Sequence, residues 1–341
     1  MCAKIAWVWP PDTFYSKRFW LEEKRDSLQY TIEEIAKEHD VLLLAPVKGK
    51  SQVIDEKYLY TSAEEALLAL ARFHPDIINL NLFGASFNTM IAPLFQKSFI
   101  TLSDVGGNLI CSYSKHIDVF FTNQESRKKT IVSKNGVSPE KVILNPYGTN
   151  TKRFYPDNSI EKTYTGIMVG DFREGKQQHL IIENWSDVEG KLLLVGRIHP
   201  PLGDADYVKK CRDLIVRLGL SEKITIRDFV THDELPGIIN SAKIGIRTST
   251  GGAGGRAATE TMACGIPLIV LKNKENEEWV KSGGIKEVEP ESIGIMVNHL
   301  ENNPDEYKEL SEAALRTIKP YTYDGMLDIF KKVIEEAGVA R

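Results

Sequence analysis

Short apolar runs alternate with segments of helical spacing along the first half of the chain. The runs are rich in β-branched and aromatic residues, which is typical of buried parallel strands; they are KIAWVW, VLLLAP, IINLNL, FITLSD, VFFTN and VILNP. Between them, residues 27–39, 63–73 and 124–135 have apolar positions at helical spacing. This alternation predicts a doubly wound α/β domain that ends near Pro146.

A second set of the same kind follows residues 147–158. Its expected strands are TGIMVGD, KLLLVGR, KITIRDF, KIGIRT, PLIVLK and IGIMV, and its clearest helices span residues 204–219, 234–241 and 257–264. Residues 323–337 form a last amphipathic helix. The pattern predicts α/β architecture with two Rossmann-like domains facing each other across a cleft, at residues 1–150 and 151–320, followed by a helical segment at 321–341.

Composition indicates a globular protein of the cytoplasm. Of the 341 residues, 42% are hydrophobic and 26% are charged, and no run approaches the ~20 apolar residues that span a bilayer. The N-terminal sequence has no small-residue cleavage site, so we expect no signal peptide. Four scattered cysteines (Cys2, Cys111, Cys211, Cys264) form no CxxC pair, which favours thiols in a reducing compartment over zinc ligands or disulfides.

A glycine-rich loop in the second half carries the strongest functional signal. Gly251, Gly252, Ala253, Gly254 and Gly255 follow the expected strand KIGIRT and precede a helix that carries Glu260. Glycine lets backbone approach a ligand closely, and the following helix presents unpaired N–H groups to an anion. A carboxylate one turn inside that helix can accept hydrogen bonds from a sugar diol. This layout indicates a nucleotide-sugar site. The absence of GxGxxG after the first strand of either domain disfavours a dehydrogenase.

Several motifs resemble those of family-4 glycosyltransferases. VSPEKVILNPYGTNTKRFYP is similar to the interdomain segment of that family, and IMVGDFREGKQQHLI, LLLVGR, DFVTHDELPGIINSAKIGIRTST and TETMACGIPLIV follow in the family's order. These matches cover most of residues 135–270. The segment YTYDGMLDIFKKVIEEA is similar to the family's closing helix, which crosses back to the first domain. The resemblance implies a GT-B fold, with an acceptor-binding first domain, and retaining transfer of a sugar from a nucleoside diphosphate to an acceptor hydroxyl.

The resemblance assigns donor-binding roles residue by residue. Glu260 matches the second glutamate of the family's paired motif, which binds the ribose hydroxyls; a solvated helix glutamate is the plain alternative. The first glutamate is replaced by Gly252, which implies an unusual donor sugar or recognition of its hydroxyls by backbone groups of residues 251–256. Val230 matches the position whose backbone contacts the nucleobase.

Basic residues of the loop VGDFREGK match positions that face the diphosphate. A departing diphosphate needs positive charge rather than a general acid. The arginine common in the family's VGR motif is Asp171 here, so Arg173 and Lys176 are expected to supply that charge. Arg256, at the start of the glycine-loop helix, is a third candidate. Ordinary surface positions are the alternative for all three.

The first domain departs from the family in two places. The family's glycine pair near the first strand is missing, and WPPDTFYSKRF stands in its place. The family's histidine is missing after FITL, where Ser103 and Asp104 are followed by Gly106 and Gly107. Asp104 is a catalytic candidate that stabilises a developing oxocarbenium ion or orients the acceptor hydroxyl, or it caps the next helix; both interpretations stay open. His116, His199 and His232 are interpreted as surface or structural residues.

No metal site and no cofactor are expected beyond a UDP-, GDP- or ADP-sugar donor. Asp204 and Asp206 open a helix, so we interpret this pair as capping residues rather than metal ligands.

The acceptor is less constrained by the sequence. A cell-surface glycan or a lipid-linked sugar is the first hypothesis. An aromatic and basic stretch (Phe14, Tyr15, Lys17, Arg18, Phe19, Trp20, Lys24, Arg25) is compatible with peripheral contact to a membrane or with a nucleic-acid strand, and equally with an ordinary amphipathic helix. Two alternatives therefore remain: a phage DNA-modifying glycosyltransferase that acts on a hydroxymethylated base, and a catalytically silent sugar-nucleotide-binding protein.

Overall fold

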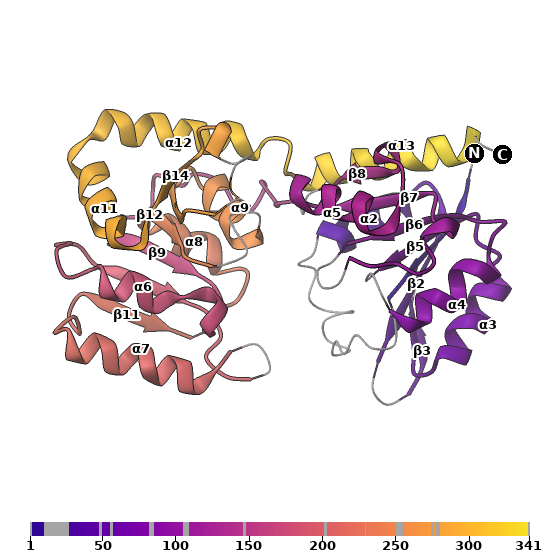
Figure 1. Cartoon of the computed structure of the whole chain (residues 1–341), viewed down its shortest axis with the longest axis horizontal. Helices are drawn as coiled ribbons and strands as arrows, with labels where there is room; N and C mark the ends of the chain where they lie inside the picture. Colours follow the sequence, from indigo (N-terminus) through magenta and orange to yellow (C-terminus); the bar gives the residue numbers. More distant parts are fainter. Residues whose placement is uncertain are drawn as a thin grey trace. The chain divides into compact units, whose positions relative to one another are not determined.

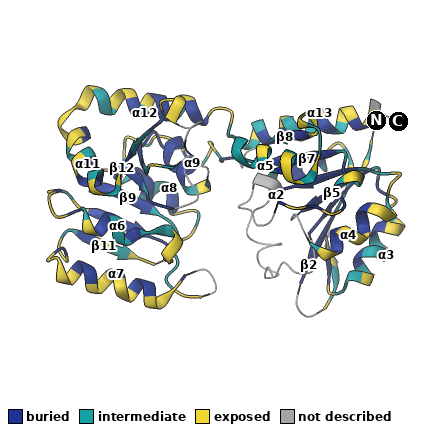
Figure 2. Cartoon of the chain, in the orientation of Figure 1, coloured by how far each residue is buried: buried dark blue, intermediate teal, exposed yellow. Residues whose placement is uncertain are grey.

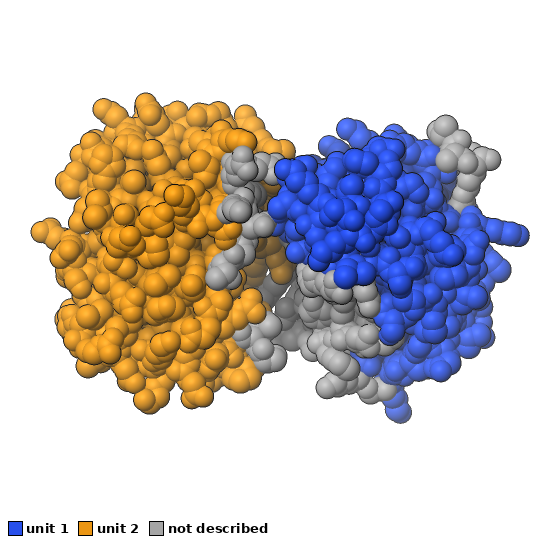
Figure 3. Space-filling model, viewed as in Figure 1, with its two compact units in different colours: residues 1–147, 323–341 blue, residues 148–322 orange. Residues whose placement is uncertain are grey.

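The computed structural model separates the chain into two compact units. Unit 1 combines residues 1–147 with residues 323–341, and unit 2 contains residues 148–322 (Figure 3). The structure describes residues 2–9, 27–47, 50–54, 57–81, 85–104, 109–145, 148–200, 203–228, 230–249, 255–273, 276 and 280–339. The stretch 14–25, Gly106, Gly107 and residues 251–254 of the glycine loop lie outside them.

Unit 1 is built on an eight-stranded sheet of order β3-β4-β2-β1-β5-β6-β7-β8. The strands pair in parallel except for β3 and β4, which pair antiparallel at one edge. Their bounds are β1 (Lys4–Val8), β2 (Asp40–Pro46), β3 (Gln52–Ile54), β4 (Lys57–Tyr60), β5 (Ile77–Asn81), β6 (Phe99–Ser103), β7 (Val119–Thr122) and β8 (Val142–Leu144).

The two faces of this sheet are covered by different helices. Alternate residues of β1 point to opposite faces, as strand geometry requires. Ala6 and Val8 pack in a cluster with α3 (Ala63–Phe73), α4 (Ser86–Leu94) and α5 (Glu125–Asn135). Ile5 and Trp7 pack in a second cluster with α2 (Ser27–Ile35) and α13 (Tyr323–Val339).

Helix α13 is an integral part of unit 1 although it follows unit 2 in the sequence. The ring centroid of Phe330 lies 4.6 Å from that of Phe121 and 5.9 Å from that of Trp7. The hydroxyl of Tyr30 donates a hydrogen bond of 2.7 Å to Asp324, which joins α2 to α13 (Figure 1). The prediction that the closing helix returns to the first domain is confirmed.

Unit 2 has a six-stranded, fully parallel sheet of order β11-β10-β9-β12-β13-β14. The strands are β9 (Tyr164–Val169), β10 (Leu192–Val195), β11 (Ile224–Arg227), β12 (Ala242–Arg247), β13 (Leu268–Leu271) and β14 (Ile285–Val288). Helices α6 (Gln178–Glu183), α7 (Ala205–Arg217) and α11 (Ile293–Asn302) cover one face. Helices α8 (Leu235–Asn240), α9 (Arg256–Ala263) and α12 (Pro304–Ile318) cover the other. Figure 2 shows α7 and α12 buried along one side and exposed along the other.

The segment IGIMV was predicted to be a strand, and this prediction is wrong. It opens α11 instead. Ile293, Val297 and Leu300 are buried while Ile295 is 70% exposed, which is the spacing of a helix with one apolar face. The sheet edge is formed by β14, a strand that the sequence did not predict. Strands β3 and β4 were also not predicted, because they are only three and four residues long.

The two α/β units with parallel sheets confirm the predicted fold class. No helix in the described ranges is long and apolar enough to cross a bilayer.

Candidate functional site in unit 2

Helix α9 organises the polar groups at the carboxyl edge of the unit 2 sheet. Gly255 is its N-cap residue, with extended backbone angles and no side chain to accept a hydrogen bond from the first helical N–H groups. The helix itself is fixed, because every residue from Ala258 to Ala263 is buried. Its N-terminus therefore presents a rigid, partially positive end to the glycine loop.

Arg247 lies against this helix N-terminus. It is the last residue of β12, and a Cβ atom added to Gly255 would lie only 2.8 Å from Arg247 Nη2. A side chain at position 255 would have to displace the guanidinium, so the absence of a side chain lets Arg247 lie close to the start of the helix. Burial lowers the pKa of Arg247 to about 10. The sequence analysis did not identify this residue.

Lys176 completes a cluster of positive charge beside Arg247. Its aliphatic chain lies over Gly170, and its backbone carbonyl accepts a 2.7 Å hydrogen bond from Thr248 Oγ1, next to Arg247. Burial, followed by the charges of Arg247 and Arg173, lowers the pKa of Lys176 to about 8, against a smaller opposing effect of Asp171. The positive charges of Lys176, Arg247 and Arg173 repel one another, and a bound anion would reduce this repulsion.

The loop that carries Lys176 has a strained backbone. Gln177 has φ 55° and ψ 37°, in the left-handed region that a side chain seldom adopts. The buried Gln178 donates hydrogen bonds to the carbonyls of Gly170 (3.2 Å) and Asp171 (3.1 Å), which holds the loop to the end of β9. Arg173 is exposed at the start of the same loop, and Arg256 is exposed in the first turn of α9. The structure thus brings Arg173 and Lys176 together with Arg247.

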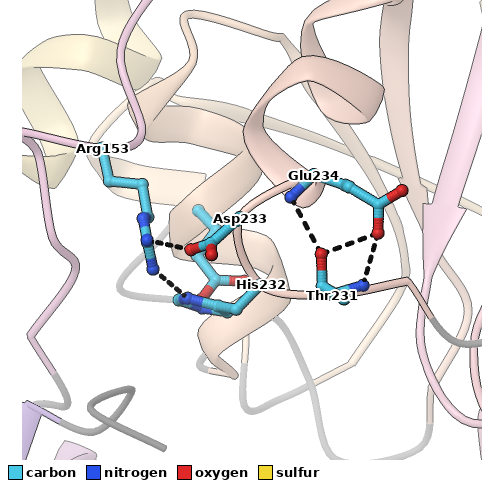
Figure 4. Close-up of polar contacts among 6 residues, drawn as sticks. Arg153, Thr231, His232, Asp233 and Glu234 are labelled. Atoms are coloured by element: carbon cyan, nitrogen blue, oxygen red, sulfur yellow. Dashed lines mark hydrogen bonds and ion pairs between the residues drawn. The ribbon is translucent and has the colours of Figure 1, made fainter.

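Glu260 is buried in α9, one turn beyond this cluster. Its side chain is 11% exposed, and its Oε1 lies 3.3 Å from Nε2 of His232. The other ring nitrogen of His232, Nδ1, lies 3.1 Å from Nη1 of Arg153, whose Nη2 pairs with Asp233 (Figure 4). Glu260 is therefore held in a polar network rather than solvated on the helix surface. His232, which the sequence analysis interpreted as surface or structural, is its direct partner.

Val230 precedes this network by two residues. Its side chain is buried and packs in the cluster that contains Leu235 and Ile239 of α8. The side chain thus anchors the segment to the core, which leaves only its backbone to contact a ligand.

Asp104 lies in unit 1, at the carboxyl end of β6. Its buried carboxylate accepts hydrogen bonds from Nε and Nη2 of Arg127 on α5, the second at 2.6 Å, and from Thr122 Oγ1 at 3.0 Å. This is the bidentate geometry that arginine and carboxylate favour.

Buried amide oxygens also lie at the carboxyl ends of two other strands of the unit 1 sheet, β5 and β8. Asn81, the last residue of β5, donates a hydrogen bond of 3.0 Å from Nδ2 to the carbonyl of Val8 on the adjacent β1. Among the residues that the structure describes, none forms a hydrogen bond with its Oδ1. The same holds for Oδ1 of Asn145, after β8. Ligands of open α/β sheets bind at this edge, and these oxygens are suited to accept hydrogen bonds from hydroxyl groups.

The predicted capping role of Asp204 is confirmed, because its Oδ1 accepts hydrogen bonds from the backbone N–H groups of Asp206 and Tyr207. Within the part of the chain that the structure describes, no three His, Cys, Asp or Glu side chains are grouped to hold a metal ion.

Residues 151–317, almost all of unit 2, match the sequence model of the family described as Glycosyl transferases group 1. Solved glycosyltransferase structures are similar over nearly the whole chain. A glycosyltransferase from Rickettsia africae ESF-5 superposes with a TM-score of 0.77 at 14% identity, covering 98% of both chains. The chain has the GT-B fold.

Two further GT-B structures are similar to the same extent. Anabaena Alr3699/HepE in complex with UDP-glucose has a TM-score of 0.76 at 14% identity, covering 98% of this chain and 100% of HepE. Sucrose-phosphate synthase from Thermosynechococcus elongatus has a TM-score of 0.76 at 14% identity, covering 99% and 100%. None of the curated proteins compared by sequence matches this GT-B chain.

Proposed function

We propose that the protein is a retaining glycosyltransferase that moves a sugar from a nucleoside diphosphate sugar to an acceptor hydroxyl, without a metal ion. The observation that carries the proposal is the arrangement along α9. The basic cluster of Lys176 and Arg247 lies at its N-terminus, and Glu260 lies four residues further along, ~6 Å on the helix axis. A nucleotide can span this distance with its phosphates at the helix end and its ribose at the carboxylate.

The charges of the cluster suit the chemistry of the departing diphosphate. When the bond between the anomeric carbon and the phosphate oxygen breaks, negative charge develops on the diphosphate. Lys176, Arg247, Arg173 and the N–H groups of α9 stabilise that charge. A phosphate oxygen of the donor takes the proton of the attacking hydroxyl as the new bond forms on the same face of the sugar. No protein nucleophile is required, and the anomeric configuration is retained.

The donor assignment rests on Glu260 and on the fold comparisons. Glu260 accepts the two ribose hydroxyls, and backbone groups of residues 251–256 bind the sugar in place of the glutamate that Gly252 replaces. Since HepE is solved with UDP-glucose, UDP is the first nucleotide to test, ahead of GDP and ADP.

The acceptor binds unit 1 in this proposal. The free Oδ1 atoms of Asn81 and Asn145 suit a polyhydroxylated acceptor, which favours a cell-surface glycan or a lipid-linked sugar made at the cytoplasmic side of a membrane. In this proposal Asp104, held by Arg127, orients the acceptor hydroxyl.

The test is release of nucleoside diphosphate from UDP-, GDP- and ADP-sugars, measured with and without EDTA. We expect slow hydrolysis with one donor, acceleration by a glycan acceptor, and equal rates in EDTA. Binding of a nucleotide sugar without turnover of any would instead identify a silent sugar-nucleotide-binding protein, and loss of activity in EDTA would refute the metal-free mechanism. The variant Lys176→Met provides the inactive control.

A further inference from the structure

The hydrogen bonds of His232 define which of its nitrogens carries the proton. The guanidinium of Arg153 has only donors, so Nδ1 of His232, 3.1 Å from Arg153 Nη1, acts as acceptor. The ring proton is then on Nε2, which donates to Glu260 Oε1 at 3.3 Å. A histidine protonated on both nitrogens would set two donors against each other at Nδ1. The geometry therefore selects a neutral ring that points one N–H at the carboxylate.

The surroundings of His232 restrain the ring in this position. Its edge packs on the ring of Phe154, with centroids 5.2 Å apart. The turn that carries it is closed by Glu234, whose Oε2 accepts hydrogen bonds from Thr231 N (3.0 Å) and Oγ1 (2.7 Å) (Figure 4). Arg153 is itself held by Asp233. These contacts fix both the place and the tautomer of the imidazole.

We propose that His232 is a positioning residue for recognition of the ribose, acting through Glu260. A carboxylate has about four lone-pair sites, and the bond from His232 occupies one of them. The carboxylate is thereby held in one orientation, with the remaining sites available to both hydroxyls of a diol. Because His232 follows Val230 by two residues, the same contact ties the nucleobase-binding segment to the ribose-binding helix. The inference rests on the proposed role of Glu260.

The experiment compares affinities for UDP and 2′-deoxy-UDP by calorimetry, or for the guanosine or adenosine pair if the donor screen selects that base. The matched variants are His232→Gln and His232→Asn. The longer Gln side chain carries an amide donor to the position of Nε2, whereas Asn reaches only the position of Nδ1 and leaves Glu260 without its donor. We expect His232→Asn to weaken UDP binding roughly tenfold and to weaken 2′-deoxy-UDP, which keeps only the 3′-hydroxyl, by less. His232→Gln should restore most of the preference for ribose. With the full donor, KM rises in His232→Asn and kcat changes little, since the ribose is remote from the reacting carbon.

Glu260→Gln separates the two hypotheses. Suppose that Glu260→Gln lowers the preference for ribose, whereas His232→Asn either leaves this preference unchanged or weakens the binding of both nucleotides equally. The positioning role of His232 is then overturned, and the proposed function stands. If Glu260→Gln itself leaves the preference for ribose unchanged, the ribose assignment fails and the inference fails with it. Thermal unfolding of each variant confirms that the comparison is made on folded protein.

Discussion

We expect Lys176 to lower the stability of the ligand-free protein and to be needed for binding the diphosphate of the donor. Its pKa is lowered from 10.5 to about 8, mainly by burial and then by Arg247 and Arg173. Below pH 8 the folded state keeps a cation where its surroundings disfavour one. Between about pH 8 and 10.5 the unfolded chain binds more protons than the folded chain, so stability rises with pH in that window. Replacement by methionine removes this penalty and retains most of the packing of the aliphatic chain.

The size of the effect follows from the change in pKa. A lowering from 10.5 to about 8 corresponds to roughly 3 kcal/mol, and solvent screening at this half-buried position leaves about 1–2 kcal/mol. For a unit of this size, Lys176→Met should raise the melting temperature of the ligand-free protein at pH 7 by about 2–8 °C. Loss of a charge-assisted bond to phosphate should weaken nucleoside diphosphate binding by about 10–100-fold.

The measurements are thermal unfolding between pH 6 and 10 and calorimetry with UDP. Lys162→Met is the matched control, because burial also lowers the pKa of Lys162, which lies at the opposite edge of the sheet and donates to Asn240 O at 2.7 Å. This control should leave UDP affinity unchanged. The reasoning is refuted if Lys176→Met is less stable than wild type at pH 7, if its advantage grows rather than shrinks above pH 8, or if its UDP affinity equals that of wild type.

Three further predictions concern the loops around α9. Arg247→Met and Arg173→Met should each lower turnover by about 10²–10³ and weaken diphosphate binding more than nucleoside binding; equal weakening of both ligands would remove these side chains from the phosphate site. Gly252→Glu should reduce transfer from the natural donor, because a side chain would enter space left to the sugar; a gain with UDP-glucose at no loss for the natural donor would show that the loop is not specialised. Gln177→Gly should stabilise the fold by about 0.5–1 kcal/mol, because glycine adopts the left-handed backbone without strain, and it should also change donor affinity. The control His74→Gly, at φ 51° in unit 1, should stabilise the fold by a similar amount and leave the kinetics unchanged. Denaturant unfolding measures the stability of both variants, and KM distinguishes their effects on the donor.

Local patterns were sufficient to predict the two parallel sheets. The runs that became β1, β5, β9 and β12 are short, apolar and bounded by turn residues, and burial of both sheet faces demands such sequences. The same logic failed for the run that opens α11, because a short apolar run does not distinguish a strand from the buried face of a helix. It also missed β14, a four-residue edge strand whose two central residues, Lys286 and Glu287, are charged, so that it has no strong apolar signal.

The candidate site was predictable only where its residues lie within one motif. Glu260 and Lys176 were found because glycines or basic residues surround them in the sequence. Arg247 lies beside Lys176 because β12 pairs with β9, and local sequence patterns do not predict which strands pair. His232 meets Glu260 across 28 residues for the same reason. A basic residue that ends a buried strand shortly before a glycine loop is a local signal that could have identified Arg247, but it was not used.

The return of α13 to unit 1 has a consequence for synthesis of the protein on the ribosome. Unit 2 is continuous in sequence and can fold as soon as residue 322 has left the exit tunnel. Unit 1 is translated first, yet its apolar sheet face around Trp7 and Phe121 is covered only in part, by α2, until α13 arrives. The half of the chain that is made first is therefore completed last, and throughout elongation it exposes the kind of surface that chaperones bind.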